Sequence, residues 1–333
     1  MADTAATLPP ARGASRFDIR SFLTRHGAWI ALVLLILVNL AITPNFATWQ
    51  TLNVNLTQVC AIVIVAVGMT LVIATGGIDL SVGALMAIAG AIAPLIFLGK
   101  LFPVPHPEIG IALAFVVPVL VVSVLGWFNG WLITRLRIQP IIATLVLFIA
   151  GRGIAQVFTN GNLQVFNLPG FQFIGLGRVF GIPFQAILMV IVVAAAAWML
   201  RRTVFGRQIL AIGGNERAAR LSGIPVASVK QRVYLISGLL SGIAGLIVIA
   251  RNSAADANLV GLGMELDAIA AVAVGGTLLT GGRATVIGTL VGALIIQLVR
   301  YTLLANGVPD AAALVAKAGI IVLAVWLQRQ GQR

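Results

Sequence analysis

The sequence predicts an all-α protein that crosses a membrane many times, with about ten transmembrane helices. Three observations lead to this fold class. Of the 333 residues, 60% are hydrophobic and only 9% are charged, whereas roughly a quarter are charged in a soluble domain. The apolar residues form blocks of about 16 to 24 residues, which is the length a helix needs to cross a bilayer. The basic residues gather at the ends of these blocks.

The apolar blocks define one membrane domain over residues 28–327. A polar, basic tail of residues 1–27 precedes it, and a second tail of residues 328–333 follows. No small-x-small cleavage site follows the first block, so we interpret that block as an uncleaved span rather than a signal peptide. The expected spans are 28–43, 54–75, 81–99, 110–133, 141–158, 183–200, 233–250, 266–281, 284–304 and 311–327.

The positions of lysine and arginine predict that both termini are cytoplasmic. If the spans alternate in direction, the outer segments hold only Lys100, Arg178 and Arg251. Cytoplasmic loops carry an excess of basic residues. The net charge of +13 therefore reflects these flanking positions and does not indicate nucleic acid binding. The basic residues of the inner segments are Arg12, Arg16, Arg20, Arg25, Arg135, Arg137, Arg201, Arg202, Arg207, Arg217, Arg220, Lys230, Arg232, Arg283, Arg329 and Arg333.

Two glycine-rich stretches interrupt the apolar blocks and share a pattern. The stretch "GGIDLSVG" begins at Gly76, and "GGTLLTGG" begins at Gly275. They predict an internal repeat whose two copies point the same way, with a transport pathway between the halves. Such a break survives inside a membrane only where protein or a water-lined cavity covers its backbone. Ser81 and its counterpart Thr280 are expected to cap the helices that follow.

Asp79 in the first stretch has only Leu278 as its counterpart, so the shared pattern does not require a carboxylate there. Two interpretations stay open: Asp79 stabilises a helix N-terminus, or it lines a polar route through the membrane. Arg152 lies inside another span and either pairs with a carboxylate such as Asp79 or extends to the interface.

Glu265 and Asp267 begin a span on the outer side, where they could bind sugar hydroxyls, dock a partner or cap the helix. The intramembrane charges, the glycines of the two breaks and one amide are our candidates for a substrate pathway. These candidates are Gly76, Gly77, Asp79, Asn129, Arg152, Glu265, Asp267, Gly275 and Gly276.

The inner loop of residues 201–232 carries seven basic residues and one acid, Glu216. We expect short amphipathic helices here, including one over residues 216–221 that Gly223 and Pro225 terminate. An ordinary basic loop is the alternative. The length of the loop and its own apolar residues favour a folded element that docks a cytoplasmic partner.

Four stretches carry a family resemblance that covers nearly the whole chain from about residue 45. The combination of "TGGIDLSVGAL", "NGWLITRLRIQPIIATL" with "GRGIA", "GRQILAIGGNERAARLSGI" and "GMELDAIAAVAVGGTLLTGGRATVIGTLVGALI" resembles the sugar-type permeases of bacterial ABC importers, which include the ribose, xylose and galactofuranose permeases. Within that group, "VAKAGIIVLAV" around Lys317 looks closer to the galactofuranose type.

The resemblance implies an inner-membrane permease that imports a monosaccharide, a pentose or a hexose, by alternating access. It implies a second permease, either identical to this chain or related to it, two cytoplasmic ATPase subunits that bind ATP and Mg²⁺, and a periplasmic sugar-binding protein. This chain itself would bind no cofactor. The residues that would couple it to the ATPase are Gly213, Gly214, Asn215, Arg217, Ala218, Ala219 and Gly223.

Other functional classes find less support in the sequence. There is no G-x-x-x-x-G-K-[ST] motif, so ATP must be hydrolysed by another chain. Neither a G-x-S-x-G motif nor a His, Cys or carboxylate cluster with metal-ligand spacing is present, so we expect neither an enzyme nor a metal site. An ion-coupled secondary transporter is the alternative function, although its coupling carboxylates would be expected at mid-membrane. The single cysteine, Cys60, is interpreted as a small buried hydrophobe.

Overall fold

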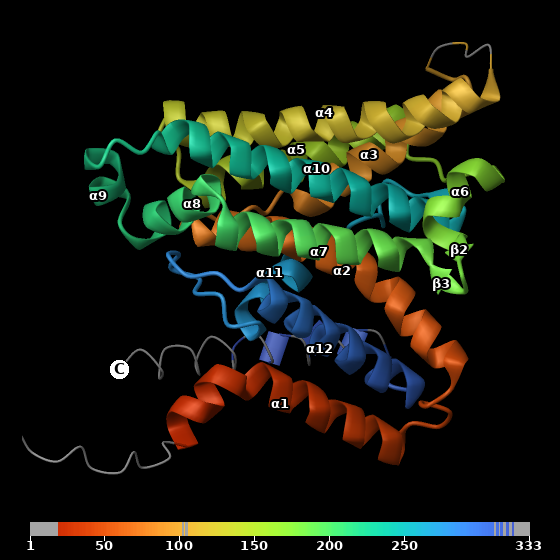
Figure 1. Cartoon of the computed structure of the whole chain (residues 1–333). Coiled ribbons are helices and arrows are strands. Elements are labelled where there is room, and N and C mark those ends of the chain that lie inside the picture. Colours follow the sequence, from red (N-terminus) through yellow and green to blue (C-terminus); the bar gives the residue numbers. More distant parts are fainter. Residues whose placement is uncertain are drawn as a thin grey trace, which may run out of the picture.

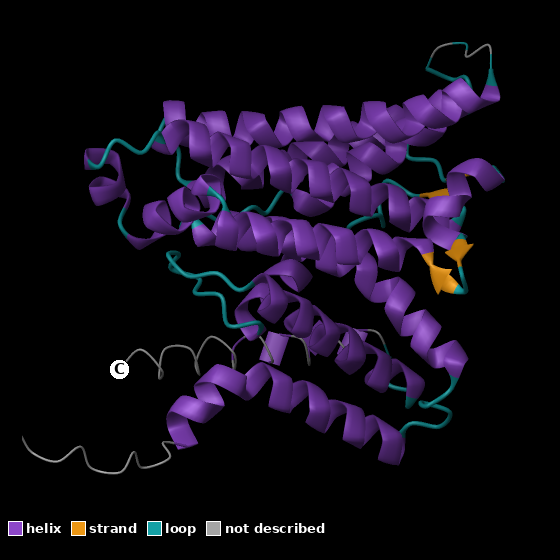
Figure 2. Cartoon of the chain, in the orientation of Figure 1, coloured by secondary structure: helices purple, strands orange, loops and turns teal. Residues whose placement is uncertain are grey.

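A computed structural model describes residues 19–101, 103, 106–309 and a few positions between 311 and 322, with the side chains of 19–26 left out. The described part is mostly helical, with loops between the helices (Figure 2). The helices are α1 (Ile19–Ile42), α2 (Trp49–Ala74), α3 (Val82–Phe97), α4 (Pro107–Arg135), α5 (Pro140–Thr159), α6 (Pro169–Leu176), α7 (Phe184–Arg202), α8 (Val204–Gly214), α9 (Glu216–Leu221), α10 (Val226–Asn252), α11 (Met264–Val274) and α12 (Val286–Ala305).

Four two-residue strands form two antiparallel pairs. One pair joins β1 (Gln164–Val165) to β4 (Ala254–Ala255), and the other joins β2 (Arg178–Val179) to β3 (Ile182–Pro183). Helix α6 and the β2–β3 pair lie at one end of the helix bundle, and α8 and α9 lie at the opposite end (Figure 1).

Helices α2, α3 and α10 form the interior of the bundle. In α2, 83% of the most apolar stretch is buried, against 28% in α5. Every residue of α3 from Val82 to Ile96 is buried. Helices α4, α5 and α7 instead expose large aliphatic side chains, as lipid-facing helices do. Helix α1 packs against α12, and α12 lies between α1 and α2 (Figure 1).

The structure confirms a polytopic helical architecture. Among the described residues, six helices, α2, α4, α5, α7, α10 and α12, are long and apolar enough to cross a membrane, and shorter apolar helices cover 27–42 and 82–97. The expected span 266–281 is wrong, because α11 ends at Val274 and a glycine-rich turn follows. The tails 1–18 and 328–333 and most of the span 311–327, with Lys317, lie outside the described residues. The count of ten spans stays a prediction.

Candidate functional site

A buried polar network around Asp79 holds the first glycine-rich break. After α2 ends, Gly76 adopts a left-handed backbone (φ 79°), which costs glycine no steric strain. The Asp79 carboxylate is fully buried. Its Oδ1 atom accepts hydrogen bonds from the backbone N–H (3.0 Å) and the hydroxyl (2.6 Å) of Ser81, and Oδ2 accepts one from the Ser237 hydroxyl (2.8 Å). Because Ser237 belongs to α10, Asp79 ties the break to that helix.

Two further side chains connect this break to its neighbours. Asn129 of α4 donates from Nδ2 to the Ser81 hydroxyl oxygen (3.0 Å), and Thr144 of α5 accepts a bond from the Leu80 N–H (3.1 Å). Buried polar groups are costly unless they are hydrogen-bonded, and these bonds join three helices to one turn. The arrangement favours the structural interpretation of Asp79. A pathway role for Asp79, Asn129 or the adjacent glycines stays a prediction.

Neither expected hydroxyl cap forms. Ser81 precedes α3, but its side chain makes no capping bond because its hydroxyl donates to the Asp79 carboxylate. Thr280 lies in a turn and starts no helix, since α12 begins only at Val286. Because α11 ends at Val274, a long connection separates it from α12. Helix α12 therefore begins later in the chain than the sequence pattern implied.

The second break ends its helix with the same hydrogen bonds as the first. In both, the glycine with positive φ donates its N–H to the carbonyl three residues earlier, and the next N–H reaches back five residues. The equivalent glycines are Gly76 and Gly276, whereas the sequence pattern had paired Gly76 with Gly275. In this alignment, which is shifted by one residue, Thr277 corresponds to Gly77. The internal repeat as a whole stays a prediction.

Threonines hold the second break. Thr277 is fully buried, and its hydroxyl oxygen accepts a bond from the Thr285 N–H (3.0 Å). The Thr285 hydroxyl donates in turn to the Gly275 carbonyl (2.8 Å). No carboxylate takes part in these bonds, in contrast to the first break.

The inner loop is folded, as the sequence predicted, and α9 covers the expected residues 216–221. Asn215 caps α9 by accepting a bond from the Ala218 N–H (3.0 Å). Glu216 pairs with Lys230 (2.6 Å) at the start of α10 and with Arg220 (3.0 Å). The hydrogen bond from Lys230 is the main reason that the pKa of Glu216 lies below its ordinary value. The pairing fixes α9 against α10.

The end of α8 packs directly on both glycine-rich breaks. We call the contact of Ala74, Gly76, Gly213, Gly281 and Gly282 the glycine joint. The Gly282 N–H donates to the Ala74 carbonyl oxygen (3.1 Å), which links the two breaks to each other. A Cβ atom on Gly213 would overlap that carbonyl oxygen and the Gly282 nitrogen, and one on Gly281 would lie 2.8 Å from the Gly76 nitrogen. Only glycine permits this approach of three backbone segments.

The predicted coupling residues divide into two groups in the structure. Gly213 and Ala219 face the interior of this chain, and Ala219 is only 5% exposed. Arg217 and Ala218 point outward, and Leu221 beside them is 85% exposed. Ala219 therefore lies on the face of α9 that packs inside the chain and not on its exposed face, and its coupling role stays a prediction. The remaining predicted coupling residues Gly214, Asn215 and Gly223 are also exposed.

Arg152 does not pair with Asp79. Its Nη1 atom donates to the carbonyls of Ala257 (2.9 Å) and Val260 (2.7 Å) in the loop before α11, and its charge interacts with Glu265. Glu265 and Asp267 are buried in the first turn of α11, as expected for the start of that helix. Arg152 and Glu265 thus interact beside this loop, and not at the Asp79 network.

Sequence reasoning missed a group of neutral amides on α2 and α12. Gln297 is 2% exposed, and its Nε2 atom donates to Oε1 of Gln58 (2.6 Å) and, more weakly, to Oδ1 of Asn55 (3.4 Å). We call Asn55, Gln58 and Gln297 the amide strip. The available signal was the occurrence of Asn55 and Gln58 three residues apart, on one helix face within an apolar block.

Comparison with protein families matches residues 52–325 to the family described as "Branched-chain amino acid transport system / permease component". The chain is 40% identical to the ribose import permease protein RbsC of Escherichia coli K12 over 321 residues, which cover 95% of this chain and 97% of that protein.

Two further relatives carry other sugars in their names. The galactofuranose transporter permease protein YtfT of Escherichia coli K12 is 38% identical, with 90% of this chain and 88% of that protein covered. The L-arabinose ABC transporter permease protein AraH of Azospirillum brasilense is 35% identical, with 98% and 94% covered. The similar identities do not favour the galactofuranose type, and these relatives give no support to an ion-coupled transporter.

Proposed function

Because this chain belongs to the permease component family of branched-chain amino acid transport systems, we propose that it is the membrane permease of an ABC importer for a monosaccharide. The sugar-specific names of its relatives support this substrate class over amino acids. The cargo is a neutral pentose or hexose. ATP is hydrolysed by a separate cytoplasmic ATPase, and a periplasmic binding protein delivers the sugar to the outer loops.

The glycine joint is the observation that carries the mechanism. A displacement of α8 must move both glycine-rich breaks, because Gly213 leaves no gap to Ala74 or Gly282. Closely packed segments pass on such displacements as discrete shifts. In the proposed cycle, ATP binding closes the ATPase dimer and moves α8 and α9. The joint transmits that motion to α2, α11 and α12, and the pathway between two permeases changes the side to which it opens.

The exposed face of α9 is the proposed ATPase contact. Leu221 is a large apolar side chain left almost fully exposed beside Arg217 and Ala218. Exposed apolar groups within a polar, basic surface are typical of a docking site. In the proposed orientation the protein lies in the inner membrane, and this face of α9 and both termini are cytoplasmic.

The test uses cells that express the permease with its own ATPase and binding protein. Uptake of radiolabelled ribose, arabinose and fructose is measured while ionophores collapse the proton and sodium gradients and ATP is maintained. We expect uptake of one of these sugars to continue. If uptake stops while the ATP concentration is unchanged, the importer assignment is wrong.

A second test addresses the docking face. We expect Leu221→Glu to insert normally but to lose co-purification with the ATPase, because a charge then replaces the central apolar contact. Val165→Glu is the matched control, because Val165 is a similarly exposed apolar residue at the opposite end of the helix bundle. This variant should retain the ATPase. Equal co-purification of both variants would contradict the proposed contact.

A further inference from the structure

The amide strip lies on a part of α2 and α12 that crosses the membrane. Gln58 is nine residues from the start of α2 at Trp49, and Gln297 is eight residues from the end of α12 at Ala305. At 1.5 Å per residue, both lie about 12 to 14 Å from the outer helix ends. Their depth is therefore within the hydrocarbon region, where polar side chains are costly.

One member of the strip is open to its surroundings. Gln58 is exposed and Asn55 is half-buried, whereas Gln297 behind them is buried and holds both by hydrogen bonds. An amide at this depth that is not covered by the chain faces water or another polar molecule, because lipid tails cannot satisfy it. The strip is thus a fixed row of amides on the wall of a space that is not lipid.

The polar surface continues from the strip toward the outer side. Arg251, at the end of α10, donates from Nη1 to the Thr57 carbonyl (3.3 Å), and its charge interacts with that of Arg300 on α12. One turn outward from Gln297, the Tyr301 hydroxyl is 3.4 Å from the Thr51 hydroxyl oxygen. Hydroxyl, amide and guanidinium groups therefore follow one another from the outer ends of α2, α10 and α12 into the membrane.

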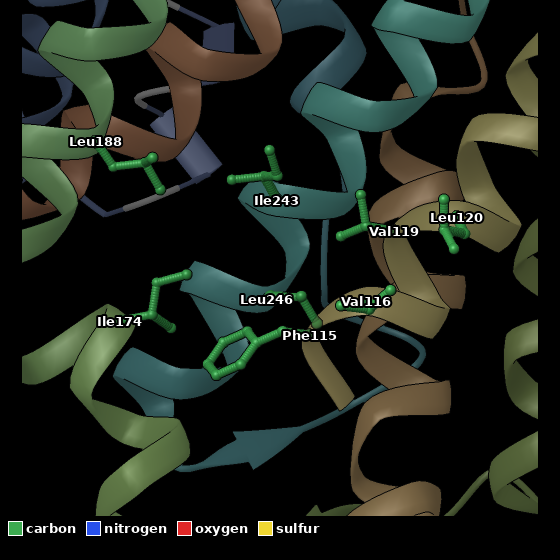
Figure 3. A pocket seen from close by; sticks show the side chains of 8 residues that line it. All are labelled: Phe115, Val116, Val119, Leu120, Ile174, Leu188, Ile243 and Leu246. Atoms are coloured by element: carbon green, nitrogen blue, oxygen red, sulfur yellow. The ribbon is translucent and has the colours of Figure 1, made fainter. Parts of the chain in front are cut away.

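An apolar groove elsewhere on the bundle provides a contrast to the amide strip. A groove of about 320 Å³ between α4, α6, α7 and α10 has only aliphatic and aromatic side chains along its wall (Figure 3). Val116 in that groove is nine residues from the start of α4, which matches the depth of Gln58 in α2. An acyl chain suits this groove, and a sugar does not, since no wall group can bond to a hydroxyl.

We propose that the amide strip contacts the hydroxyl groups of the sugar as it passes through the permease. Each amide presents both donors and an acceptor, which matches hydroxyls that donate and accept. Gln297 orients the exposed amides, so that Gln58 and Asn55 meet the sugar in a defined geometry. This inference rests on the proposed function and names the residues of this chain that the cargo meets.

Cysteine labelling in the complete assembly tests the location of the strip. In a Cys60→Ala background, Gln58→Cys should react with a membrane-impermeant maleimide added from outside, whereas Val116→Cys should not, although both side chains are exposed at equal depth. Phe180→Cys in an outer loop is the positive control, since Phe180 is fully exposed. Failure to label Gln58→Cys while Phe180→Cys reacts would overturn the proposal. A disulfide between two Gln58→Cys permeases that blocks labelling would also overturn it, because the strip would then be an interface between subunits.

Transport measurements test the contact itself. Gln58→Leu and Gln297→Leu should each lower uptake of the imported sugar at least tenfold, while co-purification with the ATPase stays unchanged. Millimolar concentrations of that sugar should slow labelling of Gln58→Cys. Unchanged uptake in both leucine variants would overturn the proposal. If the wild-type assembly imports none of the sugars offered, the proposed function fails first, and the labelling of Gln58→Cys still reports whether the strip faces water.

Discussion

The two glycine-rich breaks end their helices in the same way but are held by different groups. At the first break, the buried Asp79 carboxylate accepts three hydrogen bonds and reaches α10. At the second break, Thr277 and Thr285 make neutral bonds within the connection between α11 and α12. The comparison teaches that the backbone geometry requires glycine, whereas the strength of each anchor depends on the side chains around it.

This difference assigns different mechanical roles to the breaks. The Asp79 side chain makes three hydrogen bonds, one of them to α10, whereas the Thr277 hydroxyl accepts the Thr285 N–H within its own connection, so we expect the first break to be the firmer of the two. The second break, on the short α11, has the weaker anchor and touches α8 through Gly282. We therefore expect motion of the inner loop to be taken up mainly at the second break.

The largest effect is expected where the two breaks and α8 meet. Gly213→Ala places a methyl group against the Ala74 carbonyl and the Gly282 nitrogen. Overpacking of this kind costs about 1 to 3 kcal/mol, so sugar uptake should fall by about tenfold or more. Gly153→Ala in α5 is the matched control, because nothing lies within 4 Å of its Cβ position, and its uptake should stay within about twofold. Equal uptake by the two variants would show that the joint is not tight.

The next effect tests the first break. Asp79→Ala leaves the Ser81 N–H and the Ser237 hydroxyl without their acceptor in a buried site, so the free energy of unfolding should fall by about 2 kcal/mol. Asp79→Asn keeps one acceptor oxygen and should lose less. Thermal unfolding of the purified permease in detergent measures both. A melting temperature of Asp79→Ala equal to that of the wild type would contradict the anchoring role.

The smallest effect tests the second break. Thr277→Val has nearly the same shape but removes the acceptor for the Thr285 N–H, and we expect a loss of about 1 kcal/mol. Thr277→Ser retains the hydroxyl and serves as its control. The same unfolding measurement decides the comparison. If Thr277→Val were more damaging than Asp79→Ala, the order of anchor strengths proposed here would be reversed.

Local patterns were sufficient to predict much of the fold. The helix over 216–221 was predicted from Gly223 and Pro225, which act within one helical turn of its end, so their effect can be recognised from neighbouring residues. The expected span 266–281 instead ran through the glycine-rich stretch that begins at Gly275, whereas α11 ends at Val274 and the backbone turns at Gly276.

The candidate site was predicted less completely, for a related reason. The glycines of the breaks and of the inner loop were identified, but their mutual contact was not. The partner of Arg152 was also missed, since it consists of carbonyl groups roughly a hundred residues away in the chain. Every residue carries a backbone carbonyl, so the side-chain types in the sequence do not indicate which carbonyl groups Arg152 bonds to.

The sequence by itself determined that this protein is a bundle of apolar helices long enough to cross a membrane, and which family it resembles. Hydrophobicity, charge and glycine content act through the solvent and the local backbone, so they can be evaluated without knowing which segments meet. Only the tertiary structure decided that Gly213 sits on both breaks, that Ala219 faces inward and that Gln297 orients two amides of α2. These contacts join residues far apart in the chain, and packing alone selects them.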